Sequence, residues 1–369
     1  MPFYQNINPQ SAEGKRTIRN LLLLRKALKA RIPEKQEGSL LIATWNIREF
    51  DTPKYGGRTA EAFYYIAEII SRFDIIAIQE VKEDLSALKT LTAILGSHWK
   101  YLFTDVTAGR QGNGERLAFL LDTQKVRFGG LAGEMVLPPF QTKDRSTGQV
   151  VYEPVKQLAR TPYLCGFKAG WTTFILTTVH ILYGSAAAND PDRLGEIKEI
   201  AQAIAKKATD KYEWSNNLVL LGDFNIYSPE DQTYQAIKAA GFVIPDALKS
   251  LPGSNVPKNK FYDQIAFKVK PRRFDPTGKA GIFDYYQYVF TLNDEHSYAD
   301  QMGSAYSITS KGRKKTAAEK TRYYKTYWRT YQMSDHLPMW VEIKTDHADA
   351  YLTAKLHSGK DSTDETRHG

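Results

Sequence analysis

The sequence predicts an α/β protein whose strands are buried on both faces. Continuously apolar runs of strand length recur along most of the chain. Segments with the roughly 3.6-residue periodicity of amphipathic helices separate several of these runs. Strands that alternate with helices favour a sheet covered by helices, and unbroken apolar runs are typical of strands without a solvent-facing side.

The first expected elements are a helix, a strand, a second helix and a second strand. Apolar residues at helical spacing predict a helix over residues 15–32, which Pro33 ends. The run LLIATWNI at 40–47 predicts a buried strand, and FDIIAIQE at 73–80 predicts another. Helical periodicity fills residues 59–72 between them. This order already has the strand–helix–strand form of an α/β fold.

The middle of the chain continues the same pattern. A helix is predicted at 85–95 and a strand at 117–122. The runs TTFILTTVH at 172–180 and NLVLLGDFN at 217–225 predict two further buried strands. Between them we expect a long amphipathic helix at 190–208, because this segment opens with Asp-Pro, a typical helix start.

The last part of the chain predicts fewer regular elements. DQIAF at 263–267 predicts a short strand, and LPMWVEI at 337–343 predicts the final one. We expect irregular structure at 129–158 and 268–330, and fraying after Asp346. The expected parts of the chain are an N-terminal extension with the amphipathic helix (1–38), a main domain (39–346) with a basic and aromatic insertion (about 268–333), and a polar, flexible tail (347–369).

Composition places the chain among ordinary globular proteins. Of 369 residues, 42% are hydrophobic and 25% are charged. The single cysteine, Cys165, forms no internal disulfide, which fits a reducing compartment, and its apolar neighbours predict a buried small hydrophobe. The polar residues 1–14 and the short apolar run 21–24 do not have the form of an export signal, and no run approaches a membrane span. We expect a cytoplasmic protein without a membrane partner, and the oligomeric state stays open.

Positive charge is concentrated in one segment. The net charge is +9, and residues 311–329 hold eight Lys/Arg against a single acidic residue, Glu319. Such a patch attracts polyanions. In a helix over 320–331, one face would carry Tyr324, Tyr327, Trp328 and Tyr331, and the other Arg322, Lys325 and Arg329. The aromatics can be core and the cations solvated, or the cations can bind nucleic acid; both can hold together. We expect the segment to strengthen polynucleotide binding.

Polar residues stand where the apolar runs end. Asn46 ends the first, Glu80 the second, His180 the third, and Asp223 with Asn225 the fourth. The last strands are preceded or begun by Asp335, His336 and Asp263. One such residue is usually a cap or a turn, but carboxylates, amides and imidazoles at so many strand ends predict a single site at one edge of the sheet.

These residue types suit hydrolysis of a phosphodiester. Mg²⁺ takes oxygen ligands from carboxylates, water and substrate phosphate, and it neutralises charge that develops in the transition state. A carboxylate or imidazole must orient and deprotonate the attacking water, and a donor must help the leaving oxygen depart. The chain lacks Cys/His zinc spacing, a GxxxxGK[ST] loop and a GxSxG elbow, so those chemistries find no support.

Four segments resemble the signature blocks of the endonuclease/exonuclease/phosphatase superfamily, in the same order. They are TWNIR (44–48), IQEV (78–81), GDFN (222–225) and SDHLP (334–338). The resemblance implies a four-layer α/β sandwich, with two packed mixed β-sheets flanked by helices, and a metal-dependent phosphodiesterase. Finer details look like the pancreatic deoxyribonuclease I type, namely NIR (46–48), GERLAF (114–119), ARTP around Arg160, VH (179–180) and FYDQI (261–265).

The resemblance also implies metal and phosphate ligands. Glu80 would be the principal metal ligand, with Asn46 and Asp335 completing or orienting the site. The expected ion is Mg²⁺, with Mn²⁺ as a substitute and Ca²⁺ as an accessory ion. Asp223 would orient or deprotonate the attacking water, and Asn225 would hold the phosphate.

The same resemblance implies two acid/base dyads. They would be His180 with Glu115 and His336 with Asp263, and which histidine is the acid stays open. Arg160 would contact a phosphate oxygen, and Arg48 would do so more loosely.

The sequence departs from the deoxyribonuclease type in three ways. Secreted enzymes of that type carry disulfides, and this chain has one cysteine. Asn113 and Lys82 stand where that type places a tyrosine and an arginine against the minor groove. A long insertion also separates Asp263 from Asp335. DNA engagement is therefore expected to differ even where the cutting chemistry is shared.

The favoured function is a Mg²⁺-dependent endonuclease that acts on DNA rather than RNA and leaves a 5′-phosphate. The alternative is a phosphatase or phospholipase-like diesterase of the same superfamily acting on a small or lipid substrate. The chain has neither a PAWxDR-like block nor the apolar insertion that these enzymes need. A non-catalytic polyanion-binding module is disfavoured, because every position that matches a catalytic position of the superfamily holds a residue type able to perform that role.

Overall fold

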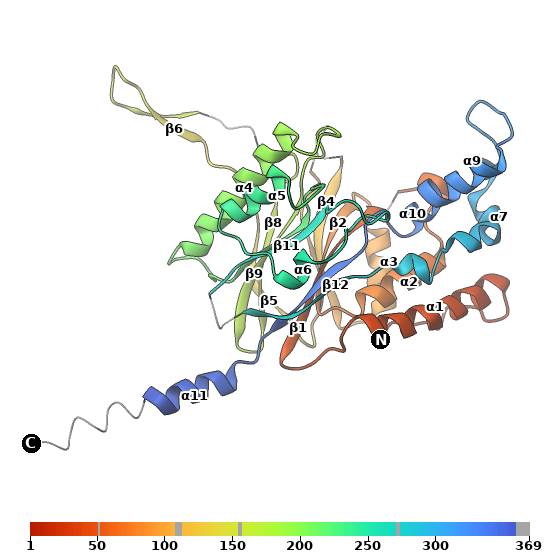
Figure 1. Ribbon diagram of the computed structural model, residues 1–369, viewed down its shortest axis with the longest axis horizontal. Helices are drawn as coiled ribbons and strands as arrows, with labels where there is room; N and C mark the ends of the chain where they lie inside the picture. Colours follow the sequence, from red (N-terminus) through yellow and green to blue (C-terminus); the bar gives the residue numbers. More distant parts are fainter. Residues whose placement is uncertain (51, 108–112, 154–156, 271–273, 359–369) are drawn as a thin grey trace, which may run out of the picture.

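The apolar runs form β-strands, and these strands pair into two stacked sheets (Figure 1). The computed structural model describes residues 1–50, 52–107, 113–153, 157–270 and 274–358. The first sheet, sheet A, contains β1 (Ser39–Phe50), β2 (Ile75–Lys82), β3 (Trp99–Phe103), β4 (Glu115–Asp122), β12 (Asp275–Ile282) and β13 (Met339–Lys344). Sheet B contains β5 (Arg127–Glu134), β8 (Tyr163–Ala169), β9 (Thr172–His180), β10 (Leu218–Asp223) and β11 (Asp263–Lys268). A separate hairpin consists of β6 (Phe140–Lys143) and β7 (Val150–Glu153).

The strand order mixes parallel and antiparallel neighbours. Sheet A runs β12-β13-β1-β2-β4-β3 and sheet B runs β11-β10-β9-β8-β5. The pairs β1–β2 and β9–β10 are parallel, and the other ladders of both sheets are antiparallel. The predicted mixed sheets are confirmed.

Helices cover the outer faces of the two sheets (Figure 1). On the side of sheet A lie α1 (Ala12–Arg31), α2 (Ala60–Ile70) and α3 (Ser86–Leu95), and on the side of sheet B lie α4 (Pro191–Thr209) and α5 (Gln232–Ala239). The shorter helices are η1 (Lys54–Gly56), α6 (Asp246–Lys249), η2 (Tyr285–Gln287), η3 (Leu292–Tyr298), α7 (Ala299–Met302), α8 (Ser304–Ser307), α9 (Ala317–Arg322), η4 (Tyr323–Trp328) and α10 (Arg329–Gln332). The result is the predicted four-layer α/β sandwich. No helix within the described ranges is both long and apolar enough to span a membrane.

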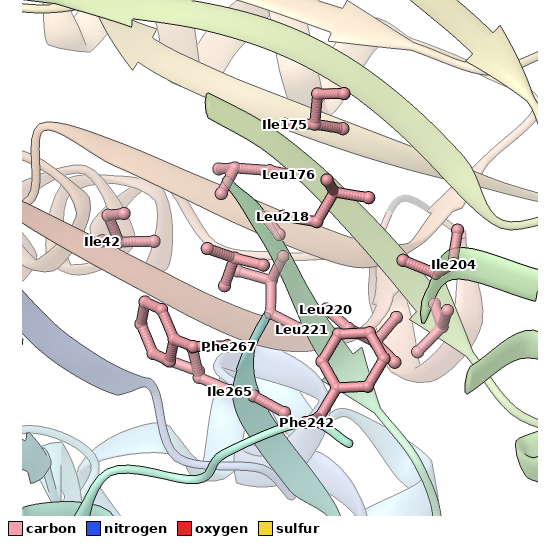
Figure 2. Packing of buried hydrophobic residues seen from close by; sticks show 14 of the residues in the cluster. Ile42, Ile175, Leu176, Ile204, Leu218, Leu220, Leu221, Phe242, Ile265 and Phe267 are labelled. Atoms are coloured by element: carbon pink, nitrogen blue, oxygen red, sulfur yellow. The ribbon is translucent and has the colours of Figure 1, made fainter. Parts of the chain in front are cut away.

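Side-chain alternation along β1 shows how the layers are held together. Leu40 and Ile42 enter the core between the sheets, where they meet side chains of sheet B (Figure 2). Leu41, Ala43 and Trp45 point the other way and pack against the helices. Burial of each large aliphatic side chain contributes about 1.5–3 kcal/mol, so both faces stabilise the strand. Cys165 lies in the inter-sheet core, where burial raises its pKa to about 12, and this confirms its expected role as a small buried side chain.

Two expectations of irregular structure were wrong. The stretch 129–158 contains most of β5 and the β6–β7 hairpin, and 268–330 contains β12 and several short helices. Strands β5 and β12 lie at sheet edges, where β5 is largely exposed and β12 is exposed or half-buried. Backbone hydrogen bonds hold both strands, so neither needs an apolar run that would mark it in the sequence. Part of the tail after Asp346 forms the helix α11 (Ala348–Ser358), and the expected fraying stays a prediction. The rest of the predicted tail, 359–369, and residues 271–273 of the predicted insertion lie outside the described residues.

The face assignment within 320–331 also needs correction. Tyr324, Trp328 and Tyr331 are buried as predicted, but Tyr327 is exposed and Arg329 is buried. The reason is that η4 is π-helical, so the periodicity of an α-helix does not apply across it. The Arg329 guanidinium lies 4.4 Å from the ring centroid of Tyr286 and donates to the carbonyl of Phe290 at 3.2 Å.

Candidate active site

Strand register in sheet B places three of the predicted site residues side by side. Asp223 is the register partner of His180 on the parallel strand β9 and of Asp263 on the antiparallel strand β11. Adjacent strands lie about 4.8 Å apart. The three side chains therefore start from neighbouring positions at the same edge of the sheet.

Gly222 allows β10 to approach β9 at this point. Its φ is +138°, and a Cβ placed on it would lie 2.1 Å from the carbonyl oxygen of Val179. Real Cβ atoms do not come this close to backbone, so a larger residue would push β10 away from β9. The glycine of the GDFN segment thus sets the position of Asp223 relative to His180.

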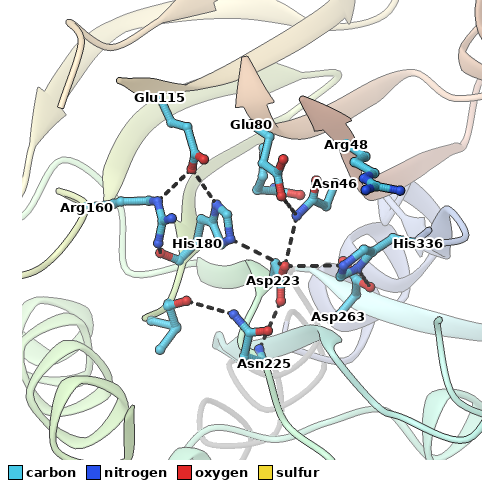
Figure 3. Close-up of polar contacts among 12 residues, drawn as sticks. Asn46, Arg48, Glu80, Glu115, Arg160, His180, Asp223, Asn225, Asp263 and His336 are labelled. Atoms are coloured by element: carbon cyan, nitrogen blue, oxygen red, sulfur yellow. Dashed lines mark hydrogen bonds and ion pairs between the residues drawn. The ribbon is translucent and has the colours of Figure 1, made fainter. Parts of the chain in front are cut away.

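The carboxylate of Asp223 lies at the centre of the site (Figure 3). Its Oδ2 accepts a hydrogen bond of 2.9 Å from Nδ2 of Asn46 on β1. The Nε2 atoms of His180 and His336 each lie 3.6 Å from the same oxygen. Asp223 is 1% exposed, so these contacts form where solvent screens charge weakly.

The first histidine pair joins β9 to β4. Nδ1 of His180 lies 3.0 Å from Oε2 of Glu115. The same carboxylate is bound by Nε of Arg160 at 2.6 Å and by Nζ of Lys82 at 3.0 Å. Burial raises the pKa of Glu115, but His180, Arg160 and Lys82 outweigh that effect and lower the pKa to about 2. Glu115 is therefore held as a carboxylate that orients the His180 ring.

The second histidine pair joins β11 to the loop before β13. Nδ1 of His336 lies 2.8 Å from Oδ2 of Asp263, and both side chains are buried. Burial lowers the pKa of His336, but the carboxylates of Asp263 and Asp223 outweigh burial and raise it well above the ordinary value. The backbone N–H of Asp263 donates to Oγ of Ser254 at 2.9 Å, which fixes the start of β11.

A break in strand alternation orients Glu80. Ile76 and Ile78 of β2 pack toward the helices, and regular alternation would send Glu80 the same way. Its φ is +62°, and the β2–β4 register shifts between Ile78 and Val81. Its carboxylate instead accepts from Nδ2 of Asn46 at 2.9 Å. Bulges often re-aim side chains beside active sites, at a cost of about 1–3 kcal/mol for positive φ.

The side chains around Glu80 are of types that can hold a hard divalent cation. The Oδ1 atom of Asn46 is buried and has no hydrogen-bond partner among the described residues, while Nδ2 of the same amide lies between the carboxylates of Glu80 and Asp223. Within the described ranges no three His, Cys, Asp or Glu side chains form a ready metal cluster. An amide oxygen beside few carboxylates suits Mg²⁺, which keeps several waters, and does not suit zinc.

Asn225 and Asp335 lie on loops beside the site. Asn225 has a φ of +53°; its backbone N–H donates to Oδ1 of Asp223 at 2.9 Å and its side chain donates to the carbonyl of Ile181 at 2.9 Å. Asp335 is exposed and directly precedes His336. Its expected part in metal binding stays a prediction.

The two predicted phosphate-binding arginines differ in their placement. Arg160 is buried behind Glu115, and its Nη1 lies 3.5 Å from the carbonyl oxygen of His180. Arg48 donates through Nη1 to Oγ1 of Thr330 at 2.5 Å and to the carbonyl of Thr326 at 3.4 Å. Arg48 thus connects the end of β1 to η4 and α10, and both phosphate contacts stay predictions.

Sequence reasoning missed three residues around this site. Lys82, noted only as a departure, is an ion-pair partner of Glu115. The Tyr262 ring lies 5.3 Å from the His336 ring, and the FYDQI segment contains it without indicating that contact. Glu196 on α4 is buried, and burial raises its pKa to about 7 although Arg160 and His180 lower it. An acidic residue within a long amphipathic helix carries no signal of this placement.

The chain is similar in sequence to known proteins of one family. The Endonuclease/Exonuclease/phosphatase family profile matches residues 43–243, more than half of the chain. A protein named deoxyribonuclease from Thioalkalivibrio sp. (strain K90mix) is 26% identical over 260 residues, covering 69% of this chain and 64% of the relative's length. Deoxyribonuclease-1 of Bos taurus is 27% identical over 281 residues, covering 71% of this chain and 88% of the relative.

A solved structure is similar in fold. The crystal structure of a functionally unknown conserved protein from Enterococcus faecalis V583 matches with a TM-score of 0.52 and 18% identity. The match covers 83% of this chain and 100% of the other. At this identity the likeness supports the fold alone.

Proposed function

The chain belongs to the endonuclease/exonuclease/phosphatase family, and from that premise we propose that it is a magnesium-dependent phosphodiesterase that cuts DNA as an endonuclease. The observation that carries the proposal is the position of Asp223 Oδ2, 3.6 Å from each of two imidazoles that are backed by their own carboxylates. His180 and His336 thus both lie beside the Asp223 carboxylate, so one imidazole can act as the acid and the other as the base. The two relatives named deoxyribonucleases support DNA as the substrate class.

Hydrolysis of a phosphodiester requires one proton to be removed and one to be supplied. Asp223 orients the attacking water, and a neighbouring imidazole takes its proton as the new P–O bond forms in line with the leaving oxygen. The other imidazole donates a proton to O3′ as the P–O3′ bond breaks. The products are a 3′-hydroxyl and a 5′-phosphate, so the atoms and protons balance.

The remaining residues position the substrate. Asn225 lies beside Asp223 and holds a phosphate oxygen, and Glu115 and Asp263 keep the two imidazole rings in one orientation. Glu80 and Asn46, with Asp335, would hold the magnesium ion. When bound, the ion would neutralise charge on the phosphate oxygens.

The test is nicking of supercoiled plasmid by purified protein in Mg²⁺. The comparison is the Asp223→Ala, His336→Ala double variant, together with wild type in EDTA. Nicking by wild type in Mg²⁺ alone would establish both nuclease activity and the site, and ligatable ends would show the 5′-phosphate. No cleavage by folded wild-type protein in Mg²⁺ would refute the proposal, and hydrolysis of a small or lipid phosphoester would then replace it.

A further inference from the structure

Three neighbouring strands each contribute one tyrosine to the edge of sheet B that carries the site. Tyr183 follows β9, Tyr227 follows β10 and Tyr262 precedes β11. Their order along the edge is the order of the strands. We call these residues the tyrosine row.

The rings of the tyrosine row contact one another and end at a catalytic imidazole. The ring centroids of Tyr262 and Tyr227 are 5.9 Å apart, those of Tyr227 and Tyr183 are 6.5 Å apart, and Tyr262 lies 5.3 Å from the His336 ring. The hydroxyls of Tyr183 and Tyr227 form a 2.8 Å hydrogen bond. The row therefore leads outward from the reaction centre along an aromatic surface.

A buried arginine fixes the outer end of the row. Arg193 of α4 is 0% exposed, and its guanidinium donates to the carbonyls of Tyr183 at 2.6 Å and Ala188 at 2.9 Å. Asp190 accepts hydrogen bonds from the backbone N–H and the hydroxyl of Ser185. The loop is thus rigid, although the Tyr183 side chain that it presents is 45% exposed.

Positive charge accompanies the row. Nζ of Lys260 lies 3.8 Å from the ring centroid of Tyr227, and the Arg193 guanidinium carbon lies 4.9 Å from it. The two cations cover the ring of Tyr227, which is half-buried, as is Tyr262. Tyr183 is exposed and therefore has the most solvent-accessible ring of the three. Arg193 is buried, but Lys260 is only partly buried and can meet a phosphate while Tyr183 stacks on a base, the combination by which proteins bind single-stranded nucleic acid.

We propose that the tyrosine row, chiefly Tyr183, stacks on the base of an unpaired nucleotide of the substrate strand, further along the strand than the scissile phosphate. This inference rests on the proposed nuclease function and adds to it the recognition of single-stranded DNA. The rigid loop lowers the entropic cost of binding, because the ring is already held in place before the substrate arrives.

The test compares two single-stranded substrates with the same backbone charge. One is oligothymidylate, and the other is an oligomer of equal length in which every nucleotide is an abasic tetrahydrofuran residue. Tyr183→Ala should raise KM for oligothymidylate roughly tenfold, the scale of a single base–aromatic stacking interaction. KM for the abasic oligomer should stay at the wild-type value, because that substrate has no base to stack.

Two control variants separate stacking from other effects. Tyr183→Phe keeps the ring and removes the hydroxyl, so it should retain the wild-type KM for oligothymidylate. Tyr212→Ala removes a tyrosine that is 83% exposed beyond α4, at the opposite end of β10, and should change neither KM. Thermal unfolding of each variant establishes that the protein is folded.

The outcomes distinguish this inference from the proposed function. If wild type cleaves no nucleic acid, the nuclease proposal itself fails. If wild type cleaves both oligomers and Tyr183→Ala changes both KM values equally or neither, the nuclease proposal stands and base stacking by the tyrosine row is overturned.

Discussion

Nδ1 of His180 lies 3.0 Å from Oε2 of Glu115, and the two residues belong to different sheets. His180 ends β9 of sheet B, whereas Glu115 begins β4 of sheet A. The pair of His336 and Asp263 also joins the two sheets, since His336 precedes β13 and Asp263 begins β11. The site therefore exists only where the two sheets pack together, and its ionisation is coupled to the stability of that packing.

The first prediction concerns acid stability. The pKa of Glu115 falls from an ordinary 4.5 to about 2 on folding, so the folded state favours the carboxylate. This contribution is fully present above pH 4.5 and is lost as the pH falls toward about 2. Glu115→Gln removes it, so the free energy of unfolding of the variant should fall less steeply over that range. Urea titrations at a series of pH values measure the slope.

Glu83→Gln is the control for acid stability, because Glu83 is an exposed glutamate on the loop after β2. It should keep the wild-type slope. Equal slopes for wild type and Glu115→Gln would show that the Glu115 ion pairs do not stabilise the fold. Glu115→Gln should also lower kcat by roughly 10²–10⁴, because His180 loses the group that orients it.

A second prediction concerns Gly222. Gly222→Ala should destabilise the protein by about 2–4 kcal/mol, since it combines a strained positive φ with a Cβ against the Val179 carbonyl. Gly195→Ala is the matched control, because Gly195 lies within α4 and a Cβ there meets no atom within 4 Å among the described residues. This change should stabilise by about 0.5–1 kcal/mol through helix propensity. Denaturant titrations measure the free energy of unfolding of both variants. Equal changes in the two variants would contradict the proposed role of Gly222.

The third prediction concerns the metal. Glu80→Gln should raise the Mg²⁺ concentration needed for half-maximal activity by roughly 10- to 100-fold, because it removes the main anionic ligand. Binding of Mn²⁺ followed by electron paramagnetic resonance gives a readout that does not depend on turnover. Glu49→Gln is the control, because the Glu49 side chain pairs with Nζ of Lys54 at 2.5 Å. Unchanged Mn²⁺ affinity in Glu80→Gln would place the ion elsewhere.

The fourth prediction concerns the basic segment. Its variant replaces four cations by glutamine, namely Lys314, Lys315, Arg322 and Lys325. DNA binding should weaken, and the slope of log affinity against log salt should flatten by roughly 0.9 for each phosphate that the protein no longer neutralises. The control replaces four exposed cations of α1, namely Lys15, Arg19, Lys26 and Lys29. An unchanged salt slope in the first variant, or an equal change in the control, would remove this segment from the binding surface.

The sequence predicted several of the buried strands and the residues at their ends. The strand predicted at 172–180 is β9 with the same bounds, and the helix predicted at 190–208 is α4 to within one residue at each end. A strand covered on both faces consists mostly of apolar residues, so most such strands are visible in the sequence, although the buried strand β8 was not predicted. Strands β5 and β12 lie at sheet edges, where backbone hydrogen bonds suffice, and they escaped prediction for that reason.

The sequence by itself determined which residue types stand at the strand ends: Asn46, Glu80, His180 and Asp223 are local features of single runs. Only the tertiary structure decided how they meet. The positive φ of Glu80 turns its carboxylate toward Asn46 against the alternation of β2, and Lys82 and Arg160 converge on Glu115 from separate elements. The row of tyrosines likewise arises from strand order. Such contacts depend on register, bulges and sheet packing, which long-range interactions set and no local sequence pattern encodes.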